Sequence, residues 1–152
     1  MIGTGYVGLV SGACFADLGN SVVCVDKNNE KIEMLNNGEI PIFEPGLEEM
    51  VKKNSASGRL KFTNDLSDSV RKSDIIFICV GTPSSKNSGS AELKYVFQAS
   101  KEISKNINKF KIIVTKSTVP VSTGDQIEKI ISKKKKKKYF EVISNPEFLR
   151  EG

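Results

Sequence analysis

The sequence contains no histidine and no tryptophan, and only three of its 152 residues are cysteine. Without histidine the chain has no imidazole to act as a base or as a metal ligand, which argues against a zinc site. Cys14, Cys24 and Cys79 lie in apolar surroundings, without a C-x-x-C spacing. This pattern is typical of reduced thiols in the cytoplasm, so we expect a cytoplasmic protein without a bound metal.

Long hydrophobic runs are also missing. No apolar segment approaches the roughly 18 residues that cross a bilayer, and the first residues lack the basic and apolar regions of a signal peptide. Hydrophobic residues make up 38% of the chain, a proportion that is sufficient for a core. A chain of this length favours a single globular domain, and we expect no membrane partner.

Positive charge is concentrated in one place. The net charge is +5, but residues 133–138 are six consecutive lysines, and without them the balance is 5 − 6 = −1. The rest of the chain has no distributed basic face, so we expect no nucleic-acid partner. We interpret the run as a solvated loop between a helix and a strand, with a nucleic-acid or membrane patch as the alternative.

Short apolar runs alternate along the chain with amphipathic stretches of helical length. The apolar runs predict six strands, at residues 1–2 (a stub), 21–26, 60–63, 74–80, 110–118 (running into a loop) and 139–148 (with a loop behind it). The amphipathic stretches predict helices at about 7–18, 27–38, 46–58, 64–73, 93–107 and 120–132. Such alternation predicts an α/β fold, a doubly wound and mostly parallel sheet of the Rossmann type, whose ligands lie beyond the carboxyl ends of the strands.

A glycine turn of the G-x-G-x-x-G kind connects the stub to the first helix, through Gly3, Gly5 and Gly8. The first glycine permits a tight turn, the second lets the backbone approach a pyrophosphate, and the third lets the helix pack on the sheet. The N–H groups at the start of the helix attract phosphate. A purely structural turn would show the same glycines, so this motif alone is weak.

Asp26 strengthens the interpretation, because it ends the second predicted strand 21 residues after Gly5. A carboxylate at this place holds the ribose hydroxyls of adenosine and repels a 2′-phosphate. The pattern therefore predicts NAD rather than NADP, although Lys27 and Lys31 weaken that preference. The alternative is an aspartate that only caps the next helix.

Five ordered segments resemble the UDP-glucose/GDP-mannose dehydrogenase family over essentially the whole chain. They are GTGYVG (3–8), PIFEPGLEE (41–49), FICVGTP (77–83), KSTVPVSTGD (116–125) and SNPEFLREG (144–152). The fourth departs from the family at Ser122, where a glycine is usual. The segment GSAELKYV (89–96) and the final REG favour the UDP-glucose members.

The resemblance implies oxidation of a sugar C6 alcohol to a carboxylate in two hydride transfers to NAD, through a cysteine thiohemiacetal and thioester. Glu147 matches the catalytic general base, and Thr118 matches the threonine that positions the attacking water. The implied cofactor-binding residues are Gly3, Gly5, Tyr6, Val7, Gly8, Asp26, Lys31, Thr82, Ser117 and Thr118. The implied residues along the UDP-glucose substrate are Glu147, Phe148, Leu149, Arg150 and Glu151.

The resemblance also indicates what these 152 residues do not contain. The family's catalytic cysteine, central helix and UDP-sugar-binding domain lie downstream of the matched region. We expect Cys14, Cys24 and Cys79 to be buried and inert rather than substitutes for that cysteine. A full first strand would need about five residues before Gly3. We therefore expect residues 1–152 to form an incomplete NAD-binding domain with weak NAD binding, marginal stability and no turnover in isolation.

Other functions stay open at this point. A dehydrogenase for GDP-mannose or UDP-N-acetylmannosamine shares most of these motifs. A non-catalytic NAD-binding module or remnant would keep the glycine turn. A hydroxyacid dehydrogenase of the 6-phosphogluconate type fits the glycine turn but not residues 144–152. The family further implies a homo-oligomer for the full-length protein.

Overall fold

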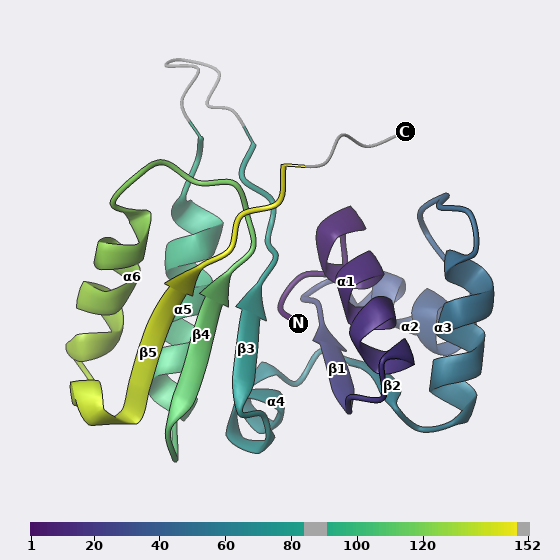
Figure 1. Cartoon of the computed structure of the whole chain (residues 1–152), viewed down its shortest axis with the longest axis horizontal. Coiled ribbons are helices and arrows are strands. Elements are labelled where there is room, and N and C mark those ends of the chain that lie inside the picture. The colour runs from purple at the N-terminus through teal and green to yellow at the C-terminus, as the bar shows by residue number, and fades with distance from the viewer. Residues whose placement is uncertain (84–90, 149–152) are drawn as a thin grey trace.

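The computed structural model describes residues 1–83 and 91–148 of the chain. These residues form parallel strands with helices packed against them (Figure 1), which confirms the predicted fold class. The strands are β1 (Val22–Val25), β2 (Leu60–Thr63), β3 (Ile75–Ile78), β4 (Lys111–Thr115) and β5 (Phe140–Ser144). Strand β1 pairs with β2, β3 with β4, and β4 with β5, always in parallel.

Each predicted helix is present, with its ends within a few residues of the predicted bounds, and two of the helices begin at a capping side chain. Asn28 accepts a hydrogen bond from the Lys31 N–H, and Asp65, rather than Asn64, accepts one from the Asp68 N–H. The helices are α1 (Tyr6–Asp17), α2 (Asn29–Asn36), α3 (Leu47–Ala56), α4 (Leu66–Lys72), α5 (Lys94–Asn106) and α6 (Thr123–Ser132), with a 3-10 turn η1 (Lys137–Tyr139).

The expected first strand is reduced to one paired residue. Ile2 forms parallel bridges with Val25 on one side and with Ile78 on the other, and so joins β1–β2 to β3–β4–β5. Five of the six predicted strands are therefore strands of the described residues, and the predicted stub is this single bridging residue. Only two residues precede Gly3, and the positive φ of Gly3 (102°) turns the chain out of the sheet there.

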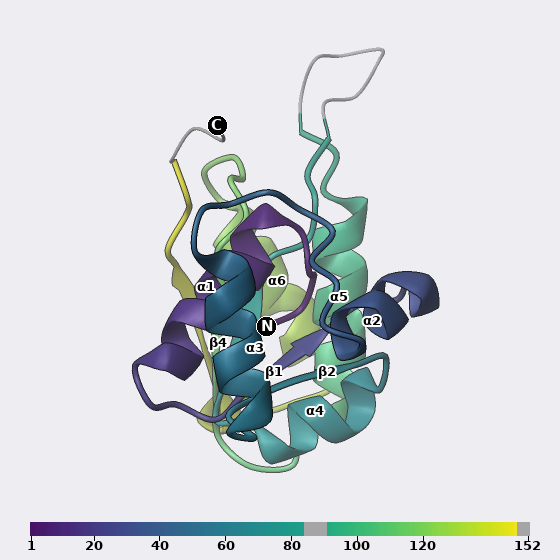
Figure 2. The ribbon, with the colours of Figure 1, turned by 90° about the vertical axis from the view of Figure 1, so that its right-hand side faces the viewer.

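Helices pack on both sides of the sheet, as Figure 2 shows for α1 and α3 on one side and α5 on the other. One hydrophobic cluster joins α4, α5 and α6 to β3–β5 and includes Ile76, Ile103 and Ile127. The other joins α1, α2 and α3 to β1 and β2 and includes Leu9 and Leu35. Ile2 belongs to the first cluster and Met1 packs against the second, as alternation along a strand requires.

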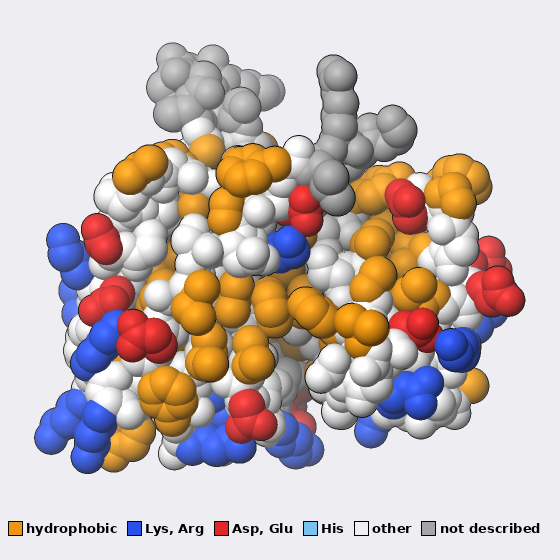
Figure 3. Space-filling model, in the orientation of Figure 1, with side chains coloured by type: hydrophobic (Ala, Val, Ile, Leu, Met, Phe, Trp, Pro, Cys, Tyr) orange, Lys and Arg blue, Asp and Glu red, His pale blue; other side chains and the backbone are white. Residues whose placement is uncertain are grey.

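Strands β3–β5 are covered by helices on one face only within the described residues. By alternation, the other face carries Ile75 and Phe77 of β3, Ile112 and Val114 of β4, and Ile143 of β5. Ile75 is 51% and Ile143 is 44% exposed, and Figure 3 shows hydrophobic side chains gathered over these strands. Phe15 of α1 contacts this face at Phe77, with the ring centroids 5.2 Å apart.

The lysine run at 133–138 connects the end of α6 to the start of β5, in agreement with the loop interpretation. The run lies at the amino end of β5, and Lys137 forms ion pairs with Glu128 and Glu141.

Among the helices of residues 1–83 and 91–148, none combines the length and apolar character of a membrane span.

Candidate functional site

The glycine turn lies between Ile2 and α1, at the carboxyl end of β1. The Gly3 N–H donates to the Val25 carbonyl oxygen at 2.8 Å. A Cβ at Gly3 would lie 2.6 Å from the Cys79 carbonyl oxygen, and one at Gly8 would lie 1.9 Å from the Gly3 carbonyl oxygen. These two glycines let the backbone of α1 pack directly on the turn and the sheet.

Gly5 has a different environment. A Cβ there would meet nothing within 4 Å, and Gly5 caps α1 without any side-chain hydrogen bond to the first N–H groups of the helix. The start of α1 therefore presents its free N–H groups to open space, where an anionic group can approach them. This cradle fits a dinucleotide pyrophosphate.

Asp26 is held against the turn by Thr4. Its Oδ2 accepts hydrogen bonds from the Thr4 N–H at 2.9 Å and from the Thr4 hydroxyl at 2.7 Å. Its Oδ1 accepts one from the Asn28 N–H at 3.1 Å. Partial burial acts to raise the pKa of Asp26, but these hydrogen bonds and the charge of Lys31 lower it overall. Asp26 is thus a fixed carboxylate beside the turn.

The sequence analysis missed Thr4, although a threonine between the first two glycines was visible as a hydrogen-bond donor.

The other predicted cofactor residues near the turn lie on helices α1 and α2. Tyr6 begins α1, and its hydroxyl donates to the Phe43 carbonyl oxygen at 2.6 Å, which ties the turn to the 40–46 loop. Val7 follows in the first turn of α1, and Lys31 lies in α2.

Ser117 and Thr82 join the loops that follow β3 and β4. The buried Ser117 hydroxyl donates to the Val80 carbonyl oxygen at 2.6 Å. The Thr82 hydroxyl donates to the Thr118 carbonyl oxygen at 3.2 Å. Both loops leave the carboxyl ends of their strands, so these predicted residues lie at the same edge of the sheet as the glycine turn.

Glu147 is paired with Lys116, which the sequence analysis did not single out. The Lys116 Nζ lies 2.8 Å from the Glu147 Oε2, and the side chains are only 14% and 25% exposed. The Glu147 N–H donates to the Lys116 carbonyl oxygen at 3.0 Å, and the Thr118 hydroxyl donates to the Glu147 carbonyl oxygen at 2.7 Å. The loops after β4 and β5 thus bring the predicted glutamate and threonine together.

The remaining substrate residues are only partly described. Phe148 is 78% exposed and follows Glu147 at the carboxyl edge. Leu149, Arg150 and Glu151, with the first two residues of the 89–96 segment, lie outside the described residues.

The cysteines differ from one another. Burial raises the pKa of Cys24 to about 11 and that of Cys79 to about 12, as expected for inert thiols. Cys14, however, is exposed, so the prediction that all three are buried was wrong. The helical period turns Leu9, Ala13 and the residues in line with them toward the core, and Cys14 away from it.

Within residues 1–83 and 91–148, no cluster of three histidine, cysteine or acidic side chains could hold a metal.

The arrangement brings together two kinds of chemistry. A helix N-terminus beside a fixed carboxylate is a geometry that can bind a dinucleotide, and a shielded glutamate beside a lysine and a threonine is one that can accept or donate a proton. Residues 1–152 match the sequence model described as the UDP-glucose/GDP-mannose dehydrogenase family, NAD binding domain. The chain belongs to this family.

The dehydrogenases that resemble the chain confirm the predicted resemblance. The chain is 59% identical to the UDP-glucose 6-dehydrogenase of Rhizobium meliloti and 58% identical to UDP-glucose 6-dehydrogenase TuaD of Bacillus subtilis. Both alignments cover 100% of this chain but only 35% and 33% of the relatives. The chain therefore spans about a third of the length of the curated relatives it matches.

Solved structures of the family agree. A ternary complex of GDP-mannose dehydrogenase from Pseudomonas aeruginosa matches with a TM-score of 0.93 and 40% identity, over 99% of this chain and 36% of that one. A UDP-glucose dehydrogenase from Pyrobaculum islandicum matches with a TM-score of 0.93 and 41% identity, over the same shares. The fold and the cofactor, NAD, follow from membership of this domain family.

Proposed function

We propose that the chain is the NAD-binding part of a UDP-glucose 6-dehydrogenase, an enzyme that oxidises UDP-glucose to UDP-glucuronate. The observation that carries this proposal is the Lys116–Glu147 pair beside Thr118, at the same sheet edge as the glycine turn. An NAD-binding module without chemistry has no use for a shielded carboxylate at that place. The names of the relatives in Rhizobium meliloti and Bacillus subtilis support UDP-glucose as the substrate.

The residues of the glycine turn hold the cofactor. The N–H groups beyond Gly5 bind the pyrophosphate, and Asp26, oriented by Thr4, accepts hydrogen bonds from the adenosine ribose. When bound, NAD accepts hydride from C6 of the sugar. The other residues proposed to border the cofactor are Gly3, Tyr6, Val7, Gly8, Lys31, Thr82, Ser117 and Thr118.

Glu147 is the general base for the water that releases the product. The Lys116 ammonium lies 2.8 Å from the Glu147 Oε2 and holds that carboxylate in a fixed position. Thr118, hydrogen-bonded to the Glu147 backbone, helps to position that water. Phe148, Leu149, Arg150 and Glu151 line the sugar nucleotide. The cysteine that would form the thiohemiacetal and thioester is not among Cys14, Cys24 and Cys79, so we propose that residues 1–152 alone do not turn over.

NAD binding is tested first, by isothermal titration of the 152-residue chain with NAD and with NADP. We expect weak binding of NAD and at least tenfold weaker binding of NADP, because the Asp26 carboxylate repels a 2′-phosphate. Asp26→Asn is expected to reduce this preference. Equal affinity for the two cofactors in both proteins would refute the proposed role of Asp26.

Catalysis is tested on the protein purified from its natural host, after its intact mass has been measured. NADH production is followed with UDP-glucose, GDP-mannose and UDP-N-acetylmannosamine in parallel. We expect the highest kcat/KM with UDP-glucose, and GDP-mannose is the second candidate because its dehydrogenase is a structural neighbour. Glu147→Gln is expected to lower kcat about a hundredfold or more.

Lys116→Met separates this proposal from a purely structural ion pair. We expect it to lower kcat with little change in KM, and Lys116→Arg is expected to restore part of the loss. The matched control is Lys109→Met. Lys109 pairs with Asp74 at the exposed amino edge of the sheet, and loss of this pair is expected to leave kcat unchanged.

The free thiols and the family support a cytoplasmic homo-oligomer. Fractionation of the natural host tests the cytoplasmic location, and sedimentation of the purified protein tests the oligomeric state.

A further inference from the structure

The lysine run at 133–138 takes no part in the proposed dehydrogenase site. Helix α6 ends at Ser132, and the N–H groups of Lys134 and Lys135 both donate to the Ile131 carbonyl oxygen at 3.0 Å. The 3-10 turn η1 then leads into β5, and the Tyr139 N–H donates to the Lys136 carbonyl oxygen at 3.0 Å. The lysines therefore lie on a hydrogen-bonded turn that holds them at the amino edge of the sheet.

Most of the charge of the run is not neutralised. The Lys137 Nζ lies 2.7 Å from the Glu128 Oε2 and 3.0 Å from the Glu141 Oε1. The five other lysines of the run form no ion pair with any residue that the structure describes. Those whose side chains are also exposed are Lys133, Lys134, Lys136 and Lys138.

Acidic side chains on the neighbouring elements already have lysine partners of their own. These ion pairs are Asp68–Lys72 on α4, Asp74–Lys109 between β3 and β4, and Glu102–Lys105 on α5. They leave the excess positive charge of this edge in place. In the view of Figure 3, lysine and arginine side chains line the lower left of the molecule, where β4 and β5 begin.

Two exposed aromatic side chains accompany the lysines. Phe110 directly precedes β4 and is 52% exposed, and Tyr139 directly precedes β5 and is 39% exposed. Since Lys111 pairs with Phe140 in the β4–β5 ladder, the two aromatic residues lie at the starts of neighbouring strands. The Lys138 Nζ is 5.2 Å from the centroid of the Tyr139 ring. Cationic and aromatic groups are thus interleaved at this edge.

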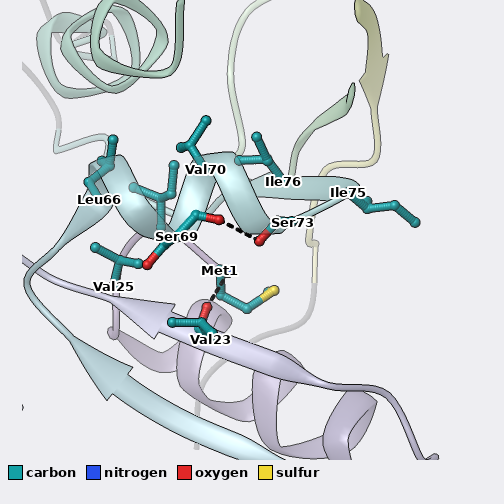
Figure 4. Close-up of a pocket in the computed structure, with 10 residues that line it drawn as sticks. Met1, Val23, Val25, Leu66, Ser69, Val70, Ser73, Ile75 and Ile76 are labelled. Atoms are coloured by element: carbon teal, nitrogen blue, oxygen red, sulfur yellow. Dashed lines mark hydrogen bonds between the residues drawn. The ribbon is translucent and has the colours of Figure 1, made fainter. Parts of the chain in front are cut away.

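Ile75 adds an aliphatic side chain at the start of the next strand, β3. It borders the recess between β1 and α4, and its side chain points outward from that recess (Figure 4). Half of it is exposed. Apolar groups therefore occur at the starts of all three strands β3, β4 and β5, beside the lysines.

This combination fits a broad anionic surface better than a single anion or a nucleic acid. The run contains lysine and no arginine, and lysine acts as a point charge rather than as a fork that reads one phosphate or base. Clusters of lysine are attracted to anionic lipid headgroups, and exposed aromatic rings suit the boundary between headgroups and acyl chains. Single-stranded nucleic acid instead needs aromatic faces free for stacking, whereas Lys138 lies against the Tyr139 ring.

We propose that Lys133, Lys134, Lys136 and Lys138, with Phe110 and Tyr139, form a patch that binds reversibly to a membrane surface rich in anionic lipids. The proposal takes up the membrane alternative that the sequence left open. Each lysine near such a surface strengthens binding about fivefold, so the binding is weak and reversible. The glycine turn and Glu147 lie at the opposite edge of the sheet and face away from the bilayer. The inference does not depend on the proposed dehydrogenase activity.

The test is cosedimentation of the 152-residue chain with lipid vesicles. One set is phosphatidylcholine alone, and in the other a third of the lipid is phosphatidylglycerol. We expect at least tenfold stronger binding to the anionic vesicles at low salt, and weaker binding at physiological salt.

Variants of equal net charge locate the binding surface. Lys134→Gln/Lys136→Gln is expected to weaken binding to the anionic vesicles about 25-fold. The matched control is Lys27→Gln/Lys61→Gln, which removes the same charge from exposed lysines outside the patch and should change binding less than about threefold. Phe110→Ser should weaken binding about threefold or more at unchanged net charge. Thermal melts of all variants should stay within about 4 °C of the wild-type Tm, since these side chains are exposed.

Three results would overturn the proposal. The first is equal binding to neutral and anionic vesicles. The second is an equal loss of binding in the two double variants, which would mean that only the net charge matters. The third is displacement of the chain from the vesicles by a DNA duplex or a single-stranded RNA at equal phosphate concentration, which would identify the patch as a nucleic-acid surface.

Discussion

Alanine at Gly5 and alanine at Gly8 should have opposite effects on this protein. At Gly8 the added Cβ would lie 1.9 Å from the Gly3 carbonyl oxygen and 3.1 Å from the Cys79 Cβ, so backbone has to move. Overpacking of this kind costs about 3 kcal/mol, which corresponds to a fall in Tm of about 6–12 °C for a domain of this size. At Gly5 the added Cβ meets nothing within 4 Å, and φ is an ordinary −75°.

Gly5→Ala should therefore keep Tm within about 4 °C of the wild-type value, since alanine is only a poorer helix cap than glycine. The same methyl group would occupy the space through which a pyrophosphate approaches the first N–H groups of α1. Loss of one charge-assisted hydrogen bond costs about 1.5–3 kcal/mol, so NAD affinity should fall about tenfold or more.

Both variants are measured by thermal melts without ligand and by isothermal titration with NAD. The reasoning is refuted if Gly5→Ala binds NAD as tightly as the wild-type chain, or if it is destabilised as much as Gly8→Ala. A loss of NAD binding in Gly5→Ala with an unchanged melt would separate the ligand-binding role of this glycine from its neighbours' packing roles.

Three further predictions concern single side chains. Ser122 has a left-handed φ of 73° at the start of α6, so Ser122→Gly should raise the free energy of unfolding by about 0.5–1 kcal/mol in a urea titration. The pKa of Asp26 is lowered in the folded chain, so its contribution to stability is present above the ordinary value of 3.8 and is lost as the pH falls through the folded pKa. Acid melts should therefore fall less steeply below pH 3.8 in Asp26→Asn than in the wild-type chain. Cys14 is the exposed thiol, so a thiol reagent should modify one cysteine quickly in the native chain and none quickly in Cys14→Ser.

Local signals predicted the elements of this fold well. Buried strands, helix caps and the glycine turn depend on residues close in sequence, and alternation of strands with helices restricts the topology to a parallel sheet. Asn28 and Asp65 cap their helices through side chains only three residues away from their partners. The stub at Met1 and Ile2 was expected to be a strand, but the turn at Gly3 leaves one residue for the ladder.

The contacts that complete the site could not be predicted in the same way. The pairing of Lys116 with Glu147 depends on the register of β4 against β5, which brings together residues 31 apart in sequence. The bonds from Thr4 to Asp26 depend on how the turn leaves the sheet. The exposure of Cys14 was predictable from the helical period, but an apolar local sequence was taken as a sign of burial.

The position of the lysine run determines how ionic strength acts on this protein. Residues 133–138 lie before β5, whose five residues span about 16 Å, whereas the nucleotide turn and Glu147 lie beyond the carboxyl ends of the strands. That separation is about two Debye lengths at physiological salt, so the field of the lysines is largely screened at the cofactor site. The rest of the chain has a net charge of 5 − 6 = −1. The association rate of NAD, whose pyrophosphate is anionic, should consequently show little electrostatic steering, despite the protein's overall positive charge.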